Sequence, residues 1–147
     1  MTTVGQILTD KGHQIHAVTP DHSVFEALEL MAKKDISAVL VIEGERLVGI
    51  FTERDYARKI ILQGRTSRDS RIGEMMSQNL LTVSPSQTVE DIMAIMTENR
   101  FRHLPVVSQG KLIGIVTIGD AVKAMLDQQQ QTIRHLSGYI SGELNPN

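Results

Sequence analysis

Residues 49–55 read Gly-Ile-Phe-Thr-Glu-Arg-Asp, and residues 114–120 read Gly-Ile-Val-Thr-Ile-Gly-Asp. These stretches end a longer duplication, because residues 20–55 align without a gap on residues 85–120 at a constant offset of 65. Upstream, residues 4–8 resemble residues 72–76 at an offset of 68, so the first copy carries three extra residues around residues 11–16. Repetition at a fixed spacing indicates one structural motif built twice along the chain.

Each copy predicts the same local structure. Apolar residues within 24–31 and 89–96 recur at i, i+3, i+4 and i+7, the spacing of an amphipathic helix. A hydroxyl residue precedes a carboxylate residue by three at the start of each helix, which is the pattern of an N-terminal cap. The two pairs are Ser23 with Glu26 and Thr88 with Asp91.

Two short strands follow the helix in each copy, joined by a turn that contains glycine. The strands are expected at residues 38–42 and 47–51, and again at 104–107 and 112–116. A second helix then follows, with apolar residues Tyr56, Ile60 and Ile61 in the first copy and Val122, Met125 and Leu126 in the second. The chain therefore belongs to the α/β class, as a tandem repeat packed with pseudo-twofold symmetry around a central cleft.

The domain organisation follows from the duplication. The first domain is expected at residues 1–62, a polar linker at 63–70, the second domain at 71–127 and a C-terminal helical tail at 128–147. In the tail, Ile133, Leu136, Tyr139 and Ile140 have the spacing of one helical face. Apolar residues on the second helices exceed what one small core needs, so a homodimer is expected; these residues are Ile60, Ile61, Val122 and Met125.

Composition excludes several classes of protein. The 147 residues are 41% hydrophobic and contain no cysteine, so the fold depends on packing rather than on disulfides. A formal net charge of −2 argues against a nucleic-acid-binding surface. The longest apolar run, residues 38–42, is too short for a membrane span, and no signal peptide is recognisable. We therefore expect a cytoplasmic protein with neither nucleic acid nor membrane as partner.

The duplicated motif at 49–55 and 114–120 resembles the cystathionine β-synthase (CBS) domain family, whose tandem pair is called a Bateman module. The resemblance extends over about residues 1–125, and residues 102–106, Arg-His-Leu-Pro-Val, also look typical of these domains. It implies an α/β regulatory module that binds AMP, ATP, NAD or a related adenosyl ligand. It does not imply catalysis, and the spacing of the remaining histidines predicts no zinc site.

The Thr-x-x-Asp spacing, where a strand ends and a helix begins, suits a ribose clamp. A carboxylate can accept hydrogen bonds from two vicinal hydroxyls, while a threonine hydroxyl and helix N–H groups can meet phosphate. The chain offers Thr52 with Asp55, and Thr117 with Asp120. The alternative is that both pairs are helix caps. Their occurrence at one repeat offset favours the ribose role.

Three further residues are candidates for the phosphate end of a nucleotide. Arg54 stands where the second copy has Gly119, so the Asp120 site is expected to receive an arginine that the Asp55 site lacks. Arg102 offers a second guanidinium, whose donors match phosphate oxygens. His103 could be a phosphate donor, an adenine neighbour or only a polar residue at a strand edge. A solvated charged face remains the alternative for either arginine.

The sequence thus predicts a non-catalytic sensor of adenine nucleotides that acts on an unidentified regulated protein. A rival hypothesis is a structural homodimerisation module whose ligand cleft is vestigial. A small nucleotide-processing enzyme ranks last, because only His103 is placed as a general base and no residue is seen to orient it.

Overall fold

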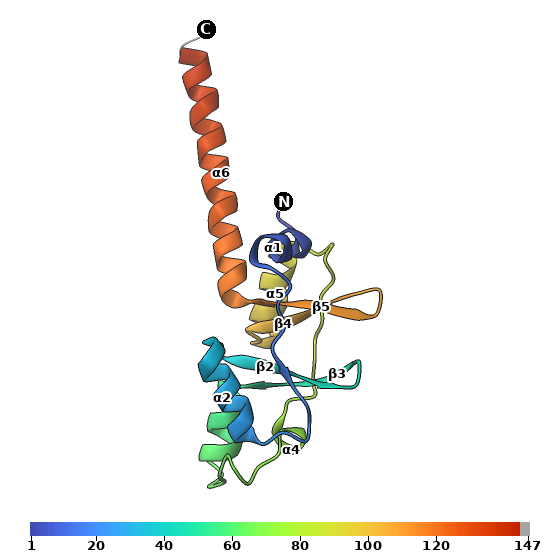
Figure 1. Ribbon diagram of the computed structural model, residues 1–147. Helices are drawn as coiled ribbons and strands as arrows, with labels where there is room; N and C mark the ends of the chain where they lie inside the picture. The colour runs from blue at the N-terminus through green and yellow to red at the C-terminus, as the bar shows by residue number, and fades with distance from the viewer. Residues whose placement is uncertain (145–147) are drawn as a thin grey trace. The chain divides into compact units, whose positions relative to one another are not determined.

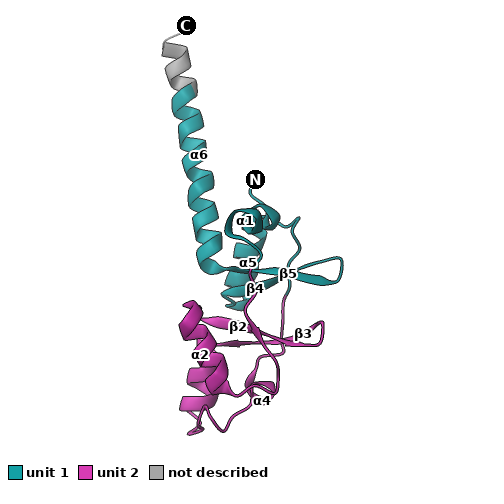
Figure 2. Ribbon diagram, in the orientation of Figure 1, with its two compact units in different colours: residues 1–13, 82–147 teal, residues 14–81 magenta. Residues whose placement is uncertain are grey.

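The computed structural model describes the backbone of residues 1–144 and the side chains of residues 1–138. Within it the chain forms two compact units, coloured separately in Figure 2. Unit 1 comprises residues 1–13 and 82–147, and unit 2 comprises residues 14–81. The units therefore do not follow the repeats, because the N-terminal segment packs with the second copy and the start of the second copy packs with the first.

Unit 2 contains a three-stranded sheet in the order β1 (Ala17–Val18), β2 (Ala38–Glu43) and β3 (Arg46–Thr52). Strand β1 runs parallel to β2, and β2 pairs antiparallel with β3. The helices of this unit are α2 (Val24–Lys34), α3 (Glu53–Asp55), the π-helix η1 (Tyr56–Ile61) and α4 (Ile72–Met75). Figure 1 shows the strands β2 and β3 beside α2. Their core includes Val24, Val39, Phe51, Ile60 and Ile72, each fully buried.

Unit 1 repeats this plan with helix α1 (Val4–Lys11) supplied by the N-terminus. Strands β4 (His103–Ser108) and β5 (Lys111–Thr117) pair antiparallel, and Val83 adds a parallel bridge to β4 where unit 2 has β1. Helices α5 (Val89–Asn99) and α6 (Ile118–Leu144) complete the unit. Its core joins Val4 and Leu8 of α1 to residues of α5, β4 and β5.

The predicted helix starts are confirmed. Ser23 accepts a hydrogen bond from the backbone N–H of Glu26, whose side chain accepts from the N–H of Ser23, and Thr88 with Asp91 does the same. Such reciprocal bonds satisfy N–H groups that a helix leaves unpaired in its first turn. The predicted strands are also confirmed: β3, β4 and β5 extend by one residue at both ends, and β2 extends by one residue at its C-terminal end. Gly44 and Gly110 have positive φ angles of 65° and 77°, as the tight turns between strands require.

The prediction for the apolar residues of the second helices is partly wrong. Ile60 is fully buried in the core of unit 2, so it is not available to a partner. Met125 is half-buried and packs against the core of unit 1. Ile61 and Val122 are exposed, at 55% and 43%. The error at Ile60 has a local cause: η1 has the wider π-helical turn, which changes the face on which each of its residues lies.

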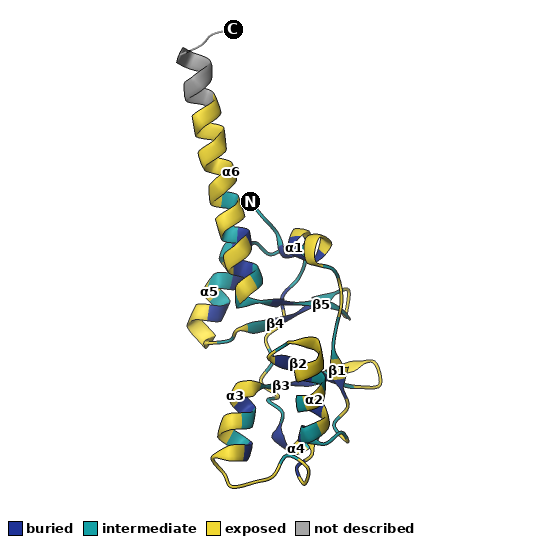
Figure 3. Cartoon of the chain, turned by 60° about the vertical axis from the view of Figure 1, so that its left-hand side comes forward, coloured by how far each residue is buried: buried dark blue, intermediate teal, exposed yellow. Residues whose placement is uncertain are grey.

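The C-terminal tail forms one helix with the second helix of unit 1 rather than a separate element. Gln128 holds the first part of α6 in place, donating to Glu90 of α5 at 2.9 Å and accepting from the backbone N–H of Thr2 at 3.1 Å. Residues 129–138 are exposed, and Figure 3 shows this part of α6 extending away from α5 and β5. Ile133 and Leu136 therefore do not pack on their own unit, and the side chains of Tyr139 and Ile140 lie outside the described residues.

The second half of the predicted linker is hydrogen-bonded to the start of α2. The carbonyl of Ser67 accepts from the N–H of Phe25, and that of Ser70 accepts from the N–H of Val24. The Arg68 guanidinium stacks over the Phe25 ring at 3.9 Å. Residues 67–70 thus complete the hydrogen bonding at the start of α2.

Candidate functional site

The glycine of each Gly-Ile strand allows a segment from elsewhere in the chain to pack against the strand. A Cβ atom at Gly114 would lie 2.7 Å from Cδ2 of Leu8, and one at Gly49 would lie 2.5 Å from Sδ of Met76. Contacts this short are sterically excluded. In unit 1 the absence of a side chain at Gly114 brings α1 against β5, which places Lys11 at the end of that strand.

Thr117 and Asp120 lie where β5 ends and α6 begins. The Asp120 carboxylate oxygen Oδ2 accepts from the backbone N–H of Thr117 at 2.9 Å, and the Thr117 hydroxyl accepts from the N–H of Asp120 at 3.2 Å. The same Oδ2 atom accepts from the Lys11 ammonium at 2.7 Å. Within the described part of unit 1, the hydrogen bonds to the Asp120 carboxylate all reach Oδ2, and none reaches the other oxygen, Oδ1. The Asp120 side chain is 22% exposed.

Thr52 and Asp55 form the equivalent pair in unit 2, with more bonds. Oδ2 of Asp55 accepts from the Thr52 backbone N–H at 3.0 Å and from its hydroxyl at 3.2 Å. Oδ1 accepts from the Ser77 hydroxyl at 2.9 Å and lies 3.2 Å from the Lys59 ammonium. The Asp55 side chain is only 11% exposed. Both carboxylate oxygens are therefore occupied within the unit.

These bonds decide part of the question that the sequence left open. Both Thr-x-x-Asp pairs are reciprocal helix caps, so the capping interpretation is correct for each. Capping uses one oxygen of Asp120 and leaves the other for a ligand, whereas Asp55 has no oxygen without a donor. The ribose role stays a prediction, and it is chemically open only at Asp120 without rearrangement of the protein.

His103 lies beside this pair, opposite Thr117 in the β4–β5 register. Burial is the main cause that lowers the pKa of His103, and the positive charges of Arg102 and Lys11 lower it further, while Asp120 acts in the opposite direction. The lowered pKa favours the neutral form of the imidazole. His103 therefore lies near two positive charges, those of Arg102 and Lys11, and near the carboxylate of Asp120.

The two candidate arginines are both exposed. Arg102 precedes β4, and its carbonyl accepts from the N–H of Ile118 at 2.9 Å, which fixes the start of α6. Arg54 lies on α3 in unit 2, whereas Asp120 belongs to unit 1. The predicted contact between Arg54 and a phosphate held at Asp120 therefore stays a prediction.

The family model of the CBS domain matches the chain over residues 4–62 and 72–127. The chain belongs to the CBS domain family. Among curated CBS proteins it is 37% identical to the mitochondrial protein CBSX3 of Arabidopsis thaliana, covering 96% of this chain and 73% of that protein. It is 35% identical to the protein YhcV of Bacillus subtilis, covering 78% of this chain and 82% of that protein.

Solved CBS structures have the same fold. A putative signal-transduction protein with CBS domains from Burkholderia ambifaria MC40-6 is 50% identical, with a TM-score of 0.84 over 87% of this chain and 96% of that one. The CBS domain pair of protein MJ0100, solved with 5'-methylthioadenosine and S-adenosyl-L-methionine, is 25% identical. Its TM-score is 0.77 over 87% of this chain and 98% of that one. The predicted family and fold class are confirmed.

Within this CBS pair, the sequence reasoning missed the cations that meet the two carboxylates. Lys59 follows Asp55 by four residues, an ordinary helical ion-pair spacing that the sequence could have suggested. Lys11 precedes Asp120 by 109 residues, so no local pattern joins them. The only signal was that Lys11 lies in the extra residues of the first copy.

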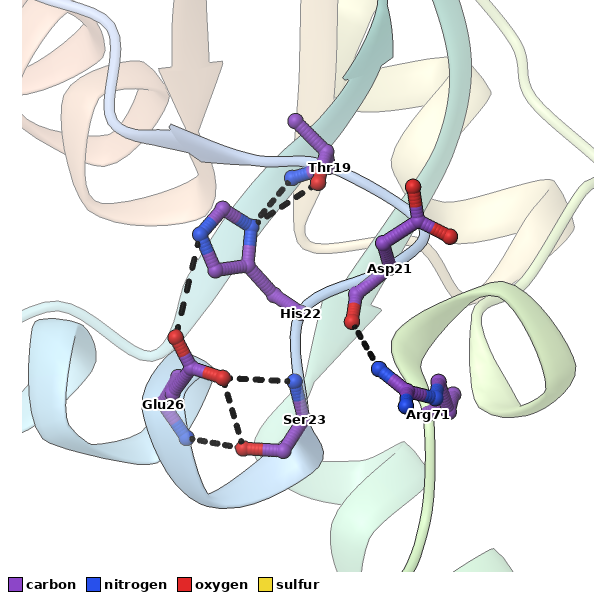
Figure 4. A network of polar contacts seen from close by, with 6 residues as sticks. All are labelled: Thr19, Asp21, His22, Ser23, Glu26 and Arg71. Carbon is purple, nitrogen blue, oxygen red and sulfur yellow. Dashed lines mark hydrogen bonds and ion pairs between the residues drawn. The ribbon is translucent and has the colours of Figure 1, made fainter.

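A separate polar surface lies at the start of α2, shown in part in Figure 4. There the His22 ring accepts from the N–H of Thr19 at 2.9 Å, and Arg71 donates to the carbonyl of Asp21 at 2.6 Å. Hydrogen bonds from Ser23 lower the pKa of Glu26. These contacts hold the entry to α2. The polar surface forms a pocket at the start of α2, and we assign no anion site to it. Acidic residues are part of its lining, and the first backbone N–H groups of α2 are already hydrogen-bonded.

No helix among the described residues is long and apolar enough to cross a membrane.

Proposed function

We propose that this CBS pair is a non-catalytic sensor that binds an adenine nucleotide, with AMP or NAD preferred and ATP as a further candidate. The observation that carries the proposal is the Asp120 carboxylate, fixed at the end of β5 by Thr117 with one oxygen left to accept from ribose hydroxyls. The MJ0100 structure supports it, because that CBS pair holds two adenosyl ligands. Binding then shifts a conformational or assembly equilibrium that a regulated protein reads.

Thermal melting with AMP, ADP, ATP, NAD and S-adenosylmethionine tests the proposal. A ligand at a hundredfold excess over its Kd stabilises the folded chain by about 2.7 kcal/mol, which is readily measured. Replacing Asp120 by Ala should weaken binding of the responding ligand by about 10- to 100-fold, because a charged acceptor for two hydroxyls is lost. Isothermal titration measures this loss. Unchanged affinity in the Asp120→Ala variant would reduce Thr117 and Asp120 to helix caps.

A structural homodimerisation module is the second candidate. It is favoured by the apolar side chains exposed on α6, where Leu126, Ile133 and Leu136 are 60%, 56% and 59% exposed. Light scattering should then give twice the 16.3 kDa mass of one chain. A dimer with no response to any of the five ligands would favour this candidate over the sensor, and a ligand-responsive monomer would exclude it.

A further inference from the structure

Lys11 occupies the carboxylate on which the proposed ribose contact depends. Its ammonium donates to Oδ2 of Asp120 at 2.7 Å and to the carbonyl of Ile115 at 3.0 Å. Next to it, His13 contacts the carbonyl of Ile113 at 2.8 Å through its Nδ1 atom. The end of α1 is thus attached to β5 at two points. The lysine is held at the site by the fold rather than lying there by chance.

A ribose that uses both oxygens of Asp120 has to share or displace this ammonium. Oδ2 already receives the Thr117 N–H and Lys11, while Oδ1 is the oxygen left for an incoming hydroxyl. The lysine side chain is 32% exposed and flexible, so it can leave the carboxylate without moving α1. The Asp120 carboxylate would then accept hydrogen bonds from two neutral hydroxyls, and the Lys11 ammonium would be left without a counter-ion.

The surroundings make that uncompensated charge unfavourable. Arg102 is a neighbouring cation, and its effect on His103 has the same sign as that of Lys11. An added negative charge lowers the electrostatic free energy of a displaced ammonium near a second cation, and an added positive charge raises it. A phosphate on the ligand supplies the negative charge. A neutral nucleoside supplies none, and a sulfonium adds a positive charge.

We propose that Lys11 makes the Asp120 site selective for phosphorylated adenosine ligands over neutral and sulfonium-bearing ones. Without ligand, the ammonium neutralises Asp120; when ribose binds the carboxylate, the ammonium transfers to the phosphate. This inference rests on the proposed nucleotide-binding function and adds the class of ligand. It distinguishes this chain from the CBS pair of MJ0100, whose ligands are methylthioadenosine and S-adenosylmethionine.

The test is isothermal titration of AMP, adenosine and S-adenosylmethionine into the full chain and three variants: Lys11→Met, Lys11→Arg and Lys123→Met. Lys123 is an exposed residue on α6, three positions after Asp120, so its replacement removes the same charge without the contact. Lys11→Met should lose about 10- to 100-fold in AMP affinity, the range for a hydrogen bond to a charged group. It should bind adenosine and S-adenosylmethionine as tightly as the unmodified chain or more tightly, because Asp120 is no longer occupied.

The controls separate a selective role from a structural one. Lys11→Arg should keep the preference for AMP, and Lys123→Met should change no affinity by more than about twofold, since an exposed charge at that separation is screened. Equal losses for AMP and adenosine in Lys11→Met would mean that Lys11 only positions α1 and would overturn the inference. AMP binding that is unchanged in Lys11→Met would also overturn it, leaving the proposed function intact. If none of the ligands binds the unmodified chain, the proposed function fails and this inference fails with it.

Discussion

Replacing Gly114 by Ala tests the packing that brings Lys11 to Asp120. The new Cβ would lie 2.7 Å from Cδ2 and 3.0 Å from Cδ1 of Leu8, both well inside van der Waals contact. Leu8 is fully buried in the core of unit 1, where its neighbours restrict a change of its side chain. We therefore expect α1 to shift away from β5. Overpacking of this kind costs about 1–3 kcal/mol of the free energy of unfolding.

Gly119→Ala is the matched control for this substitution. A Cβ at Gly119 meets only the Thr117 hydroxyl at 3.6 Å, an ordinary contact, and the residue lies in the first turn of α6. Alanine is favoured over glycine in a helix by up to about 1 kcal/mol, so this variant should be as stable as the unmodified chain or more so. The two variants differ by position alone, since both add one methyl group.

Calorimetry or circular dichroism should show Gly114→Ala melting lower by roughly 3–10 °C, with no decrease for Gly119→Ala. Because the shift of α1 carries Lys11 with it, Gly114→Ala should also lose part of its preference for AMP over adenosine. If Gly114→Ala melted at the same temperature as the unmodified chain, the close packing of α1 on β5 would be refuted. The positioning of Lys11 would then lose its structural basis.

Four further substitutions test single residues. Arg54→Ala should weaken the binding of AMP but leave the binding of adenosine almost unaffected, and the loss of AMP affinity should be smaller at high salt. Titration at two salt concentrations measures both effects. Equal weakening of the binding of both ligands would refute a phosphate contact. His103 has a lowered pKa in the folded chain, so the unfolded chain binds the proton more tightly and stability is lost as pH falls below about 6.5. His103→Gln should therefore lose less stability than the unmodified chain between about pH 7.5 and 5.5 in urea titrations, and an identical pH profile would contradict this. Asp55→Asn should lower the free energy of unfolding by about 1–3 kcal/mol, because a buried acceptor of several hydrogen bonds loses its charge. Asp120→Asn should lower it by less than about 1 kcal/mol, because its ion pair is partly exposed. Equal losses in thermal melts would show that the two carboxylates have the same role.

The sequence predicted the elements whose causes are local. The strands to within one residue at each end, the glycine turns and the caps at Ser23 and Thr88 follow from a few neighbouring residues, and the structure contains them. The methionines that the helical spacing places on the apolar faces of 24–31 and 89–96, Met31 and Met96, are 3% exposed. Short-range rules suffice here because the competing conformations are excluded within one helical turn or one strand pair.

Contacts between distant segments were beyond those rules. The pairing of α1 with the second copy joins residues 80 or more positions apart, through hydrogen bonds such as Gly5 N–H to the carbonyl of Pro85 at 2.9 Å. Unit 2 contains the equivalent contact, in which the Gly73 N–H donates to the carbonyl of Pro20. A repeat shows that two segments are alike, but it does not show with which copy each segment packs. The sequence did not predict the burial of Ile60, because a π-helical turn contains more residues than an α-helical turn and so places a given residue on a different face.

The two copies of Thr-x-x-Asp differ in where each carboxylate finds its cation. Lys59 lies four residues after Asp55 on adjoining helices, so this pair forms whenever the local turn forms. The corresponding position in the second copy is Ala124, which is 8% exposed in the core of unit 1 and offers no charge. Asp120 therefore takes its cation from the N-terminal helix, through a long side chain that a ligand can displace. We therefore expect Asp55 to act as a structural acceptor and Asp120 to exchange its cation for a ligand. Unequal ligand sites are thus predicted from Lys59 and Ala124 alone, without the contrast between Arg54 and Gly119 from which the sequence first suggested them.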